Sequence, residues 1–231
     1  MALGTALTDA TTVSTTAGTH NISLTAGGIS VAQGLMGSGK LTVCLMSNEY
    51  DYEGNEPTSG GDYTMIRVYY TEYTGSTRDP KISITMGEVT SVINAEYSGD
   101  DDDGYIRNSN LDDTVNWATL RGDIDTVGNS RNVIGTNALN GIYARHSSGR
   151  GGDVIRDIRR SFFVFDLSGI SGTITAAQFS FYLDNFGDTG DAAKIIAVQA
   201  TALAGSTADY GNCFAAEVAV TDNATFFGAN F

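Results

Sequence analysis

The sequence predicts an all-β protein, built as an antiparallel β-sandwich or jelly roll. Apolar residues come in short alternating runs, which is the period of half-buried strands. The 11 Tyr and 10 Phe residues favour packed, pleated sheets, and only 2 Pro residues interrupt the pattern. No apolar stripe with helical spacing extends beyond about two turns.

The first half of the chain alternates between strands and turns. Residues 20–24 alternate, residues 29–31 follow a Gly-Gly turn, and residues 41–46, apolar except for Thr42, are typical of a buried strand. After a polar loop at 48–62, residues 65–70 resume the alternation, with Ile66, Val68 and Tyr70 on one face and Arg67 and Tyr69 on the other. We expect one more strand after the turn 74–80, at residues 81–85.

The second half repeats this pattern less evenly. Its predicted strands are residues 104–107, 117–121, 161–166, 177–183, 194–199 and 217–220. Residues 86–98 have mixed character, and residues 122–152, rich in Asn, Gly, Ser and Arg, are interpreted as irregular.

Charge and composition exclude several classes of function. The net charge of −14 and the lack of a basic stripe oppose binding to nucleic acid. Such a balance fits a solubilising surface, or one that collects divalent cations. The beginning of the chain lacks the basic and apolar regions of a signal peptide, and no run approaches the ~20 apolar residues of a membrane span, so we expect no membrane insertion. Cys44 is expected to be a buried thiol, with a disulfide to the distant Cys213 as the alternative.

Two stretches of the second half resemble a known domain. Residues 160–170, Arg-Ser-Phe-Phe-Val-Phe-Asp-Leu-Ser-Gly-Ile, followed by the strand 174–183, resemble DNRLRE-type β-sandwich domains, the jelly-roll modules of bacterial surface and phage virion proteins. Residues 103–107 and 117–121 are similar to the opening of these domains. Residues 41–70 are similar to their closing half, and residues 73–84, Tyr-Thr-Gly-Ser-Thr-Arg-Asp-Pro-Lys-Ile-Ser-Ile, to their last strand.

The order of these parts differs from that of the family. The DNRLRE sequence motif that gives the family its name is also absent from this chain. A closing half at 1–85 comes first, then a bridge at 86–99, then an opening half at 100–231. Three arrangements would produce this order: a circularly permuted domain, exchange of halves between subunits in a head-to-tail polymer, or one repeat cut from a longer protein. An unpaired half-sandwich exposes backbone hydrogen-bonding groups and must find a partner, in its own chain or another.

Acidic residues give two candidate Ca²⁺ sites, since this cation prefers six to eight hard oxygen ligands. The better-formed one lies in the polar loop and consists of Asp51, Glu53, Asn55 and Asp62. The other is the run Asp100, Asp101, Asp102 and Asp103. A solvated acidic loop is the alternative interpretation in each case, and the spacing is not that of an EF-hand.

Aromatic residues offer a candidate sugar-binding platform made of Tyr63, Tyr69 and Trp117, with core packing as the alternative. The run Gly34–Lys40 fits the start of a phosphate-binding loop, but a strand follows where a helix is required, so we reject it. His20 and His146 lie in no catalytic pattern, which predicts a protein that is not an enzyme.

These observations predict a non-enzymatic structural protein: a subunit of a virion, tail, fibre or extracellular filament that associates with copies of itself through β-sandwich edges. The alternative is a carbohydrate-binding or adhesive module of a longer surface protein, with a cell-surface glycan as its partner. We expect it in a virion or at the cell surface, with no cofactor other than structural Ca²⁺.

Overall fold

The structure is a computed structural model that describes residues 5–13, 16–37, 39–58, 63–70, 77–95, 104–110, 116–122, 130–133, 141–148, 154–188 and 194–200. Its strands are β1 (Thr11–Thr12), β2 (Gly18–Ser23), β3 (Lys40–Ser47), β4 (Tyr63–Val68), β5 (Lys81–Met86), β6 (Val89–Asn94), β7 (Gly104–Asn110), β8 (Ser130–Val133), β9 (Ile142–Ser148), β10 (Val154–Asp166), β11 (Ala176–Asp188) and β12 (Lys194–Ala200). The helical elements are α1 (Ala26–Leu35), a π-helical turn η1 (Asn48–Tyr52) and α2 (Trp117–Gly122).

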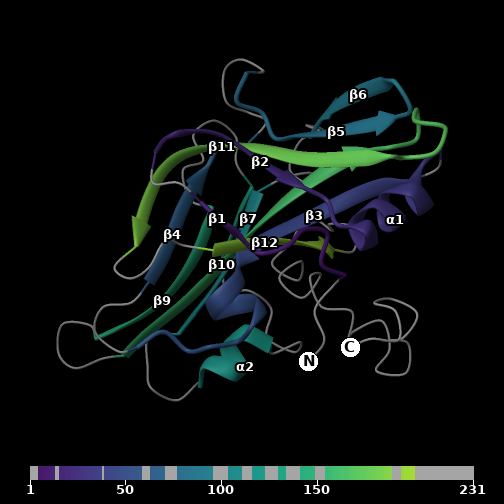
Figure 1. Ribbon diagram of the computed structural model, residues 1–231. Coiled ribbons are helices and arrows are strands. Elements are labelled where there is room, and N and C mark those ends of the chain that lie inside the picture. The colour runs from purple at the N-terminus through teal and green to yellow at the C-terminus, as the bar shows by residue number, and fades with distance from the viewer. Residues whose placement is uncertain are drawn as a thin grey trace, which may run out of the picture.

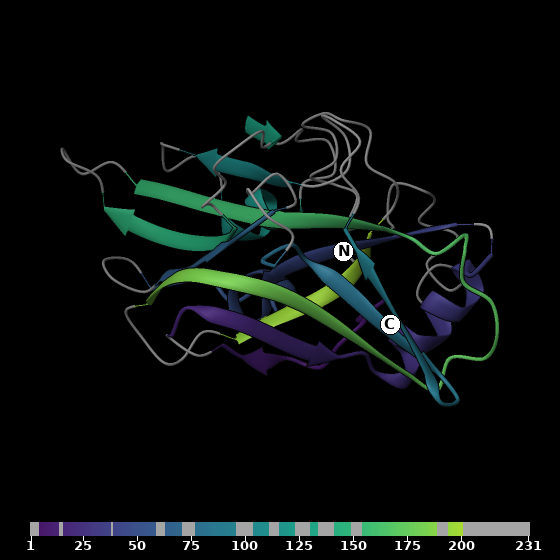
Figure 2. The same cartoon turned by 90° about the horizontal axis from the view of Figure 1, so that it is seen from above.

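Two long strands, β10 and β11, organise the sheet. All pairings between the described strands are antiparallel, and together these strands form one 12-stranded sheet. β10 pairs with β3, β7 and β9, whereas β11 pairs with β2, β4 and β5. The sheet folds over so that β10 and β11 lie in two layers (Figures 1 and 2). The predicted all-β, sandwich-like architecture is confirmed, although the sheet is open.

Aromatic side chains fill the space between the two layers. Phe163 of β10 lies 5.6 Å from Phe179 of β11 and 5.4 Å from Tyr70, measured between ring centroids. Phe165 and Phe181 extend this cluster at 5.9 and 5.7 Å from Phe179. All five rings are at most 1% exposed. Offset and edge-to-face pairs at these spacings stabilise a core beyond the burial of their area.

A second core lies on the other face of β3 and β10. It contains Cys44 and Met46 of β3, Ile158 and Phe162 of β10, and Trp117 of α2. Because both faces of β3 are covered, every residue after Lys40 in this strand is buried. This explains why apolar residues occupy both faces of the strand, with Thr42 the exception between Leu41 and Met46.

The two halves of the chain are interleaved within the sheet. β3, from the first half, lies between β10 and β12, from the second. β11 in turn lies between β2 on one side and β4 and β5 on the other. The strands that resemble a closing half are therefore paired with those that resemble an opening half inside one chain.

Two predicted strands are helices instead. Residues 29–31 lie inside α1, whose N-cap Thr25 accepts a hydrogen bond from the backbone N–H of Gly28 at 3.1 Å. The Gly-Gly pair, interpreted as a turn, allows α1 to approach the backbone of Leu7. Residues 117–121 lie in α2, where Asn116 caps the first turn by accepting from the N–H of Thr119 at 2.8 Å. Local capping outweighs weak strand propensity in both cases.

Three strands occur where the sequence suggested mixed or irregular structure. β6 lies in the predicted bridge and pairs with β5 across the turn Gly87–Glu88, where Gly87 has a φ of +61°. β8 and β9 lie in the segment interpreted as irregular. β9 joins β4 to β10 and so connects the two layers. The predicted strand 217–220 lies outside the described residues.

Candidate functional site

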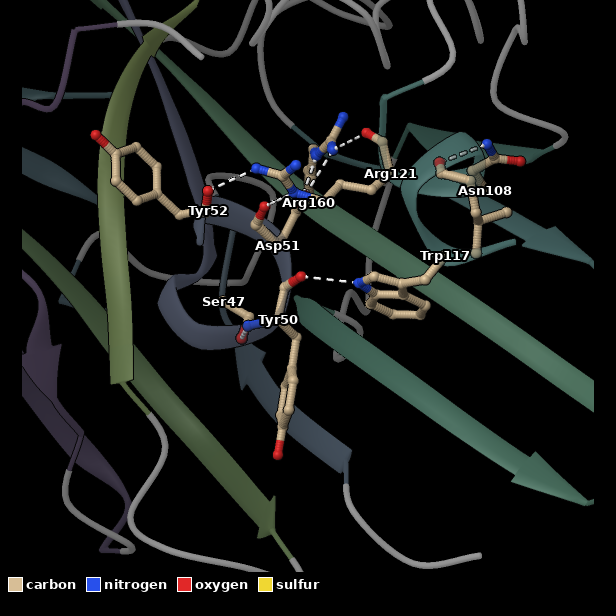
Figure 3. A network of polar contacts seen from close by, with 9 residues as sticks. Ser47, Tyr50, Asp51, Tyr52, Asn108, Trp117, Arg121 and Arg160 are labelled. Atoms are coloured by element: carbon tan, nitrogen blue, oxygen red, sulfur yellow. Dashed lines mark hydrogen bonds and ion pairs between the residues drawn. The ribbon is translucent and has the colours of Figure 1, made fainter. Parts of the chain in front are cut away.

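The polar loop after β3 begins with η1, which directs the side chain of an aspartate into the protein interior. η1 buries Asp51, which is 1% exposed and faces Arg160 of β10, which is 0% exposed. The Arg160 guanidinium donates from Nε to Oδ2 and from Nη2 to Oδ1, both at 2.7 Å (Figure 3). This two-point geometry is the strongest form of the arginine–carboxylate pair, and it joins β10 to the start of the loop.

Helix α2 closes over this ion pair. Arg121 donates from Nε to the carbonyl oxygen of Asp51 and from Nη2 to that of Tyr52, the latter at 2.6 Å. Arg160 Nη2 also donates to the carbonyl oxygen of Arg121 at 2.7 Å. Trp117 of α2 donates from Nε1 to the carbonyl oxygen of Tyr50 at 3.0 Å (Figure 3). η1, α2 and β10 are therefore joined by a single polar network in which the Asp51 carboxylate faces two arginines, Arg160 at 2.7 Å and Arg121 at 3.9 Å.

This network changes the interpretation of the first candidate Ca²⁺ site. Both oxygens of Asp51 are bound by Arg160 rather than being available to a cation. Glu53 accepts from Asn48 Nδ2 at 2.7 Å and from Asn55 Nδ2 at 3.4 Å. Within the described ranges, no group of three or more His, Cys, Asp or Glu side chains is arranged to hold a metal ion.

The placement of Asp51 as a metal ligand is therefore wrong, because a buried arginine neutralises it. Asp62 and the run Asp100, Asp101, Asp102 and Asp103 lie outside the described residues. A Ca²⁺ site in those residues stays a prediction.

The proposed sugar platform does not form around Trp117. Its ring is 2% exposed and packs in the second core, so it cannot stack on a sugar. Tyr69 is 7% exposed and donates its hydroxyl to Asp184 Oδ1 at 2.8 Å. The Arg78 guanidinium lies 4.9 Å from the Tyr69 ring centroid and covers it. The alternative, core packing, is correct for these two rings; Tyr63 begins β4 and pairs with Arg145 of β9.

Sequence reasoning missed the buried arginine, although a signal was present. Arg160 lies two residues from Ile158 and from Phe162, and both of these are buried on the same side of β10. The alternation therefore places Arg160 on an apolar face. A charged residue at such a position requires a buried partner.

One edge strand of the sheet, β6, is uncharged and carries two exposed valines. β6 is the last strand in the sheet order, and among the described strands it pairs with β5 alone. Val89 and Val92 of β6 are 63% and 60% exposed. The sequence of β6, Val-Thr-Ser-Val-Ile-Asn, contains no charged residue and no proline. It therefore lacks the side chains that usually prevent an edge strand from pairing with another chain.

Neither described helix is long and apolar enough to cross a membrane. No protein-family model, curated protein or solved structure matches this chain, so the resemblance to DNRLRE-type domains stays an expectation based on its motifs.

Proposed function

We propose that this protein is a non-enzymatic structural subunit that associates with a second copy of itself through the β6 edge. The observation that carries the proposal is the unprotected outer edge of β6, with its two exposed valines. Natural sheets block such edges with Lys, Pro or bulges, because an open edge is a template for pairing with another strand. β6 has none of these features.

The geometry favours pairing of β6 with β6 of the second copy across a two-fold axis. An antiparallel pair of identical strands is self-complementary, so each subunit offers the same surface. Burying a valine side chain is worth about 1.5–3 kcal/mol, and the uncharged strand avoids repulsion between like charges. The net charge of −14 opposes association at low ionic strength, so added salt should strengthen the contact.

A subunit with this property suits a virion, tail, fibre or extracellular filament, which is the role that the sequence predicts. The interleaved sheet supports it, since the closing and opening halves complete each other within one chain and leave β6 available for a partner. A longer polymer would need a second contact in addition to β6.

Light scattering coupled to size exclusion tests the proposal. The wild-type protein should form dimers or larger species as concentration and salt rise, and Val92→Lys should shift the population to monomers. The matched control is Ala118→Lys, which adds the same charge at an exposed position of α2 and should leave association unchanged. A wild-type protein that remains monomeric at high concentration in moderate salt would contradict the proposal.

The second candidate function is a carbohydrate-binding or adhesive module. The observation in its favour is a face where arginines lie over tyrosine rings, with Arg159 4.8 Å from the Tyr143 ring centroid. A glycan array probed with and without a chelator separates the two functions, because specific binding by a monomer supports the module.

A further inference from the structure

We propose that one face of β4, β9, β10 and β7 binds the carboxylate or sulfate groups of an acidic polysaccharide. The proposal rests on the second candidate function, the carbohydrate-binding module, for which it names an acidic ligand, and it concerns a different surface from β6. It rests on the register of four neighbouring strands, on the partners of their arginines and on the exposure of the face.

Register places arginines from all four strands on a single face. Residues directly opposite each other in an antiparallel pair point to the same side. Met65 is opposite Tyr143, Tyr143 is opposite Arg159, and Arg159 is opposite Arg107. The period of two adds Arg67 on β4 and Arg145 on β9 to this face, which we call the arginine face.

The other side of the same strands is the apolar one. Ile66, Ile142, Ala144 and Ile158 are at most 1% exposed, and they belong to the two cores. On the arginine face, Arg67, Tyr143 and Arg145 are half-buried, and the Arg107 and Arg159 side chains are 31% and 19% exposed. A ligand can therefore reach this face, whereas the opposite one is packed inside the protein.

Positive charge is concentrated here in an otherwise acidic chain. Arg67, Arg107, Arg145 and Arg159 are four of its 13 lysine and arginine residues. Among the described residues of β4, β7, β9 and β10, the one carboxylate on this face is Asp157, 1% exposed, whose Oδ1 and Oδ2 accept from Arg107 at 2.9 and 2.8 Å; Asp184 of β11 lies at its margin, where it accepts from Tyr69. Arg159 Nη2 shares Oδ2 at 3.3 Å. Asp157 together with Asp184 at the margin cannot neutralise four guanidinium groups, so the face carries a local excess of positive charge.

Three of these arginines have hydrogen-bonding capacity to spare. Nε of Arg67, of Arg145 and of Arg159 is buried and has no hydrogen-bond partner within the described part of the chain. A buried N–H of a charged group without an acceptor is costly, so a shift of the arginine side chain that exposes its Nε would let a ligand oxygen supply the missing acceptor. Guanidinium groups match carboxylate and sulfate oxygens in a planar, two-point geometry.

Tyrosine rings hold the guanidinium groups in position. Arg145 and Arg159 lie 5.5 and 4.8 Å from the Tyr143 ring centroid, and Arg159 lies 5.7 Å from that of Tyr105. Stacking on rings restricts the long side chains before a ligand arrives, which lowers the entropy lost on binding. The same contacts cover the tyrosine faces, which disfavours base stacking and hence nucleic acid as the ligand.

The overall negative charge does not prevent this binding at physiological salt. Charges further away than the Debye length of about 8 Å are largely screened, so the local arginines dominate the potential at the face. A polymer that presents repeated anionic groups can engage several arginines at once, which raises its affinity over that of a single anion.

Fluorescence anisotropy of the full chain with labelled polymers tests the proposal. The probes are polygalacturonate, which carries carboxylates, and dextran sulfate, which carries sulfates; neutral dextran and a DNA duplex are the controls. We expect saturable binding to one or both acidic polysaccharides, and the better ligand identifies the preferred group. Binding to neither, or equal binding to the DNA duplex, would overturn the proposal.

Variants locate the site. Arg145→Gln should weaken binding about tenfold, and Arg67→Gln combined with it should weaken binding further, because each removes a charged donor. Lys194→Gln removes the same charge from an exposed position of β12 and should leave binding unchanged. An equal loss in Lys194→Gln would show that net charge alone attracts the polymer, and the arginine face would then be the wrong site.

Two further measurements keep the result unambiguous. Circular dichroism and the thermal midpoint should show that Arg145→Gln is folded, and Arg145→Lys, which keeps the charge but loses the planar donor geometry, should recover part of the affinity. The association state of each variant should match that of the wild type, since β6 is unchanged. Failure of anion binding and failure of self-association are therefore separate outcomes.

Discussion

The Arg160 guanidinium binds both carboxylate oxygens of Asp51 at 2.7 Å, and both side chains are removed from solvent although 109 positions separate them in the sequence. Removing one partner of such a pair costs far more stability than removing both, because the remaining buried charge loses its two-point partner and cannot be solvated. Without Arg160, Asp51 would keep only Arg121, whose Nε lies 3.9 Å from Oδ1. Loss of either partner alone should therefore destabilise η1 and its attachment to β10.

Arg160→Met should lower the free energy of unfolding by about 3–5 kcal/mol, because it leaves Asp51 charged and buried. The double variant Arg160→Met with Asp51→Leu should recover much of that loss. Urea denaturation of the two single variants and the double variant measures the coupling. Arg156→Met on the same strand is the control, since its partner Glu56 is 39% exposed and the pair should contribute less than about 1 kcal/mol. Simple additivity of the two substitutions would contradict this account of the pair.

Two glycines of α1 should respond in opposite directions to alanine. A Cβ at Gly28 would lie 2.9 Å from the carbonyl carbon and Cα of Leu7, and closer still to the carbonyl oxygen, so Gly28→Ala forces the helix away and should destabilise the protein by more than about 1 kcal/mol. A Cβ at Gly34 meets nothing within 4 Å, so Gly34→Ala should stabilise by about 0.5–1 kcal/mol through helix propensity. The midpoints of thermal and urea unfolding measure the stability of both variants. Equal changes in stability would rule out the close approach of Gly28 to Leu7.

Asp79 and Asp166 should give opposite pH dependence. Burial raises the pKa of Asp79 above its ordinary value, against the opposing effect of Lys81, and Oδ1 of Asp79 is buried without a hydrogen-bond partner among the described residues. Folding therefore favours the protonated form of Asp79. The folded protein loses stability as the pH rises through the raised pKa, because the charged carboxylate must then be buried. Asp79→Asn should gain stability at pH 7 and change little at pH 3.

The control for this experiment is Asp166, whose pKa is lowered by hydrogen bonds from the hydroxyl and the backbone N–H of Ser168. The N–H donates to Oδ1 at 2.8 Å. Stability from this carboxylate is present above its ordinary pKa and is lost as the pH falls through the lowered one. Asp166→Asn should therefore lose stability at pH 7 and little at pH 2. If both substitutions changed stability at pH 7 in the same direction, the buried environment assigned to Asp79 and the hydrogen-bonded one assigned to Asp166 would be refuted.

Cys44 should be unreactive in the folded protein. Its side chain is 0% exposed in the second core, beside Met46 and Phe162. In the Cys213→Ser variant, an aromatic disulfide reagent should modify Cys44 quickly only after denaturation, because the native core excludes it. Rapid labelling under native conditions would show that α2 and η1 open readily.

The period of the apolar residues was enough to predict the strands whose apolar side chains face a core along most of the strand. The runs at 41–46, 161–166 and 177–183 became β3, β10 and β11 because their apolar residues face cores along most of their length. The alternation at 65–70 also holds: Ile66, Val68 and Tyr70 are at most 1% exposed.

Elements whose stability comes from distant contacts were missed. α1 depends on the approach to Leu7, and β9 is a strand because β4 and β10 pair with it on both sides, while its own arginines and histidine suggest a surface loop. The partner of Asp51 was missed for the same reason. Asp51 belongs to an acidic pattern locally, and only the fold shows that Arg160 is its partner.

The position of β3 in the sheet has a consequence for synthesis on the ribosome. This apolar strand ends at Ser47, yet one of its two neighbours, β12, ends at Ala200. At a translation rate of about 5–20 residues per second, the intervening stretch takes roughly 8–30 s to appear. Until β10 emerges the strand has neither of its neighbours, and until β12 emerges one of its edges stays unpaired. Nascent chains of this protein should therefore depend on chaperones that hold exposed apolar segments, and ribosome profiling of chaperone-bound chains should find them enriched once residues 40–47 have left the exit tunnel.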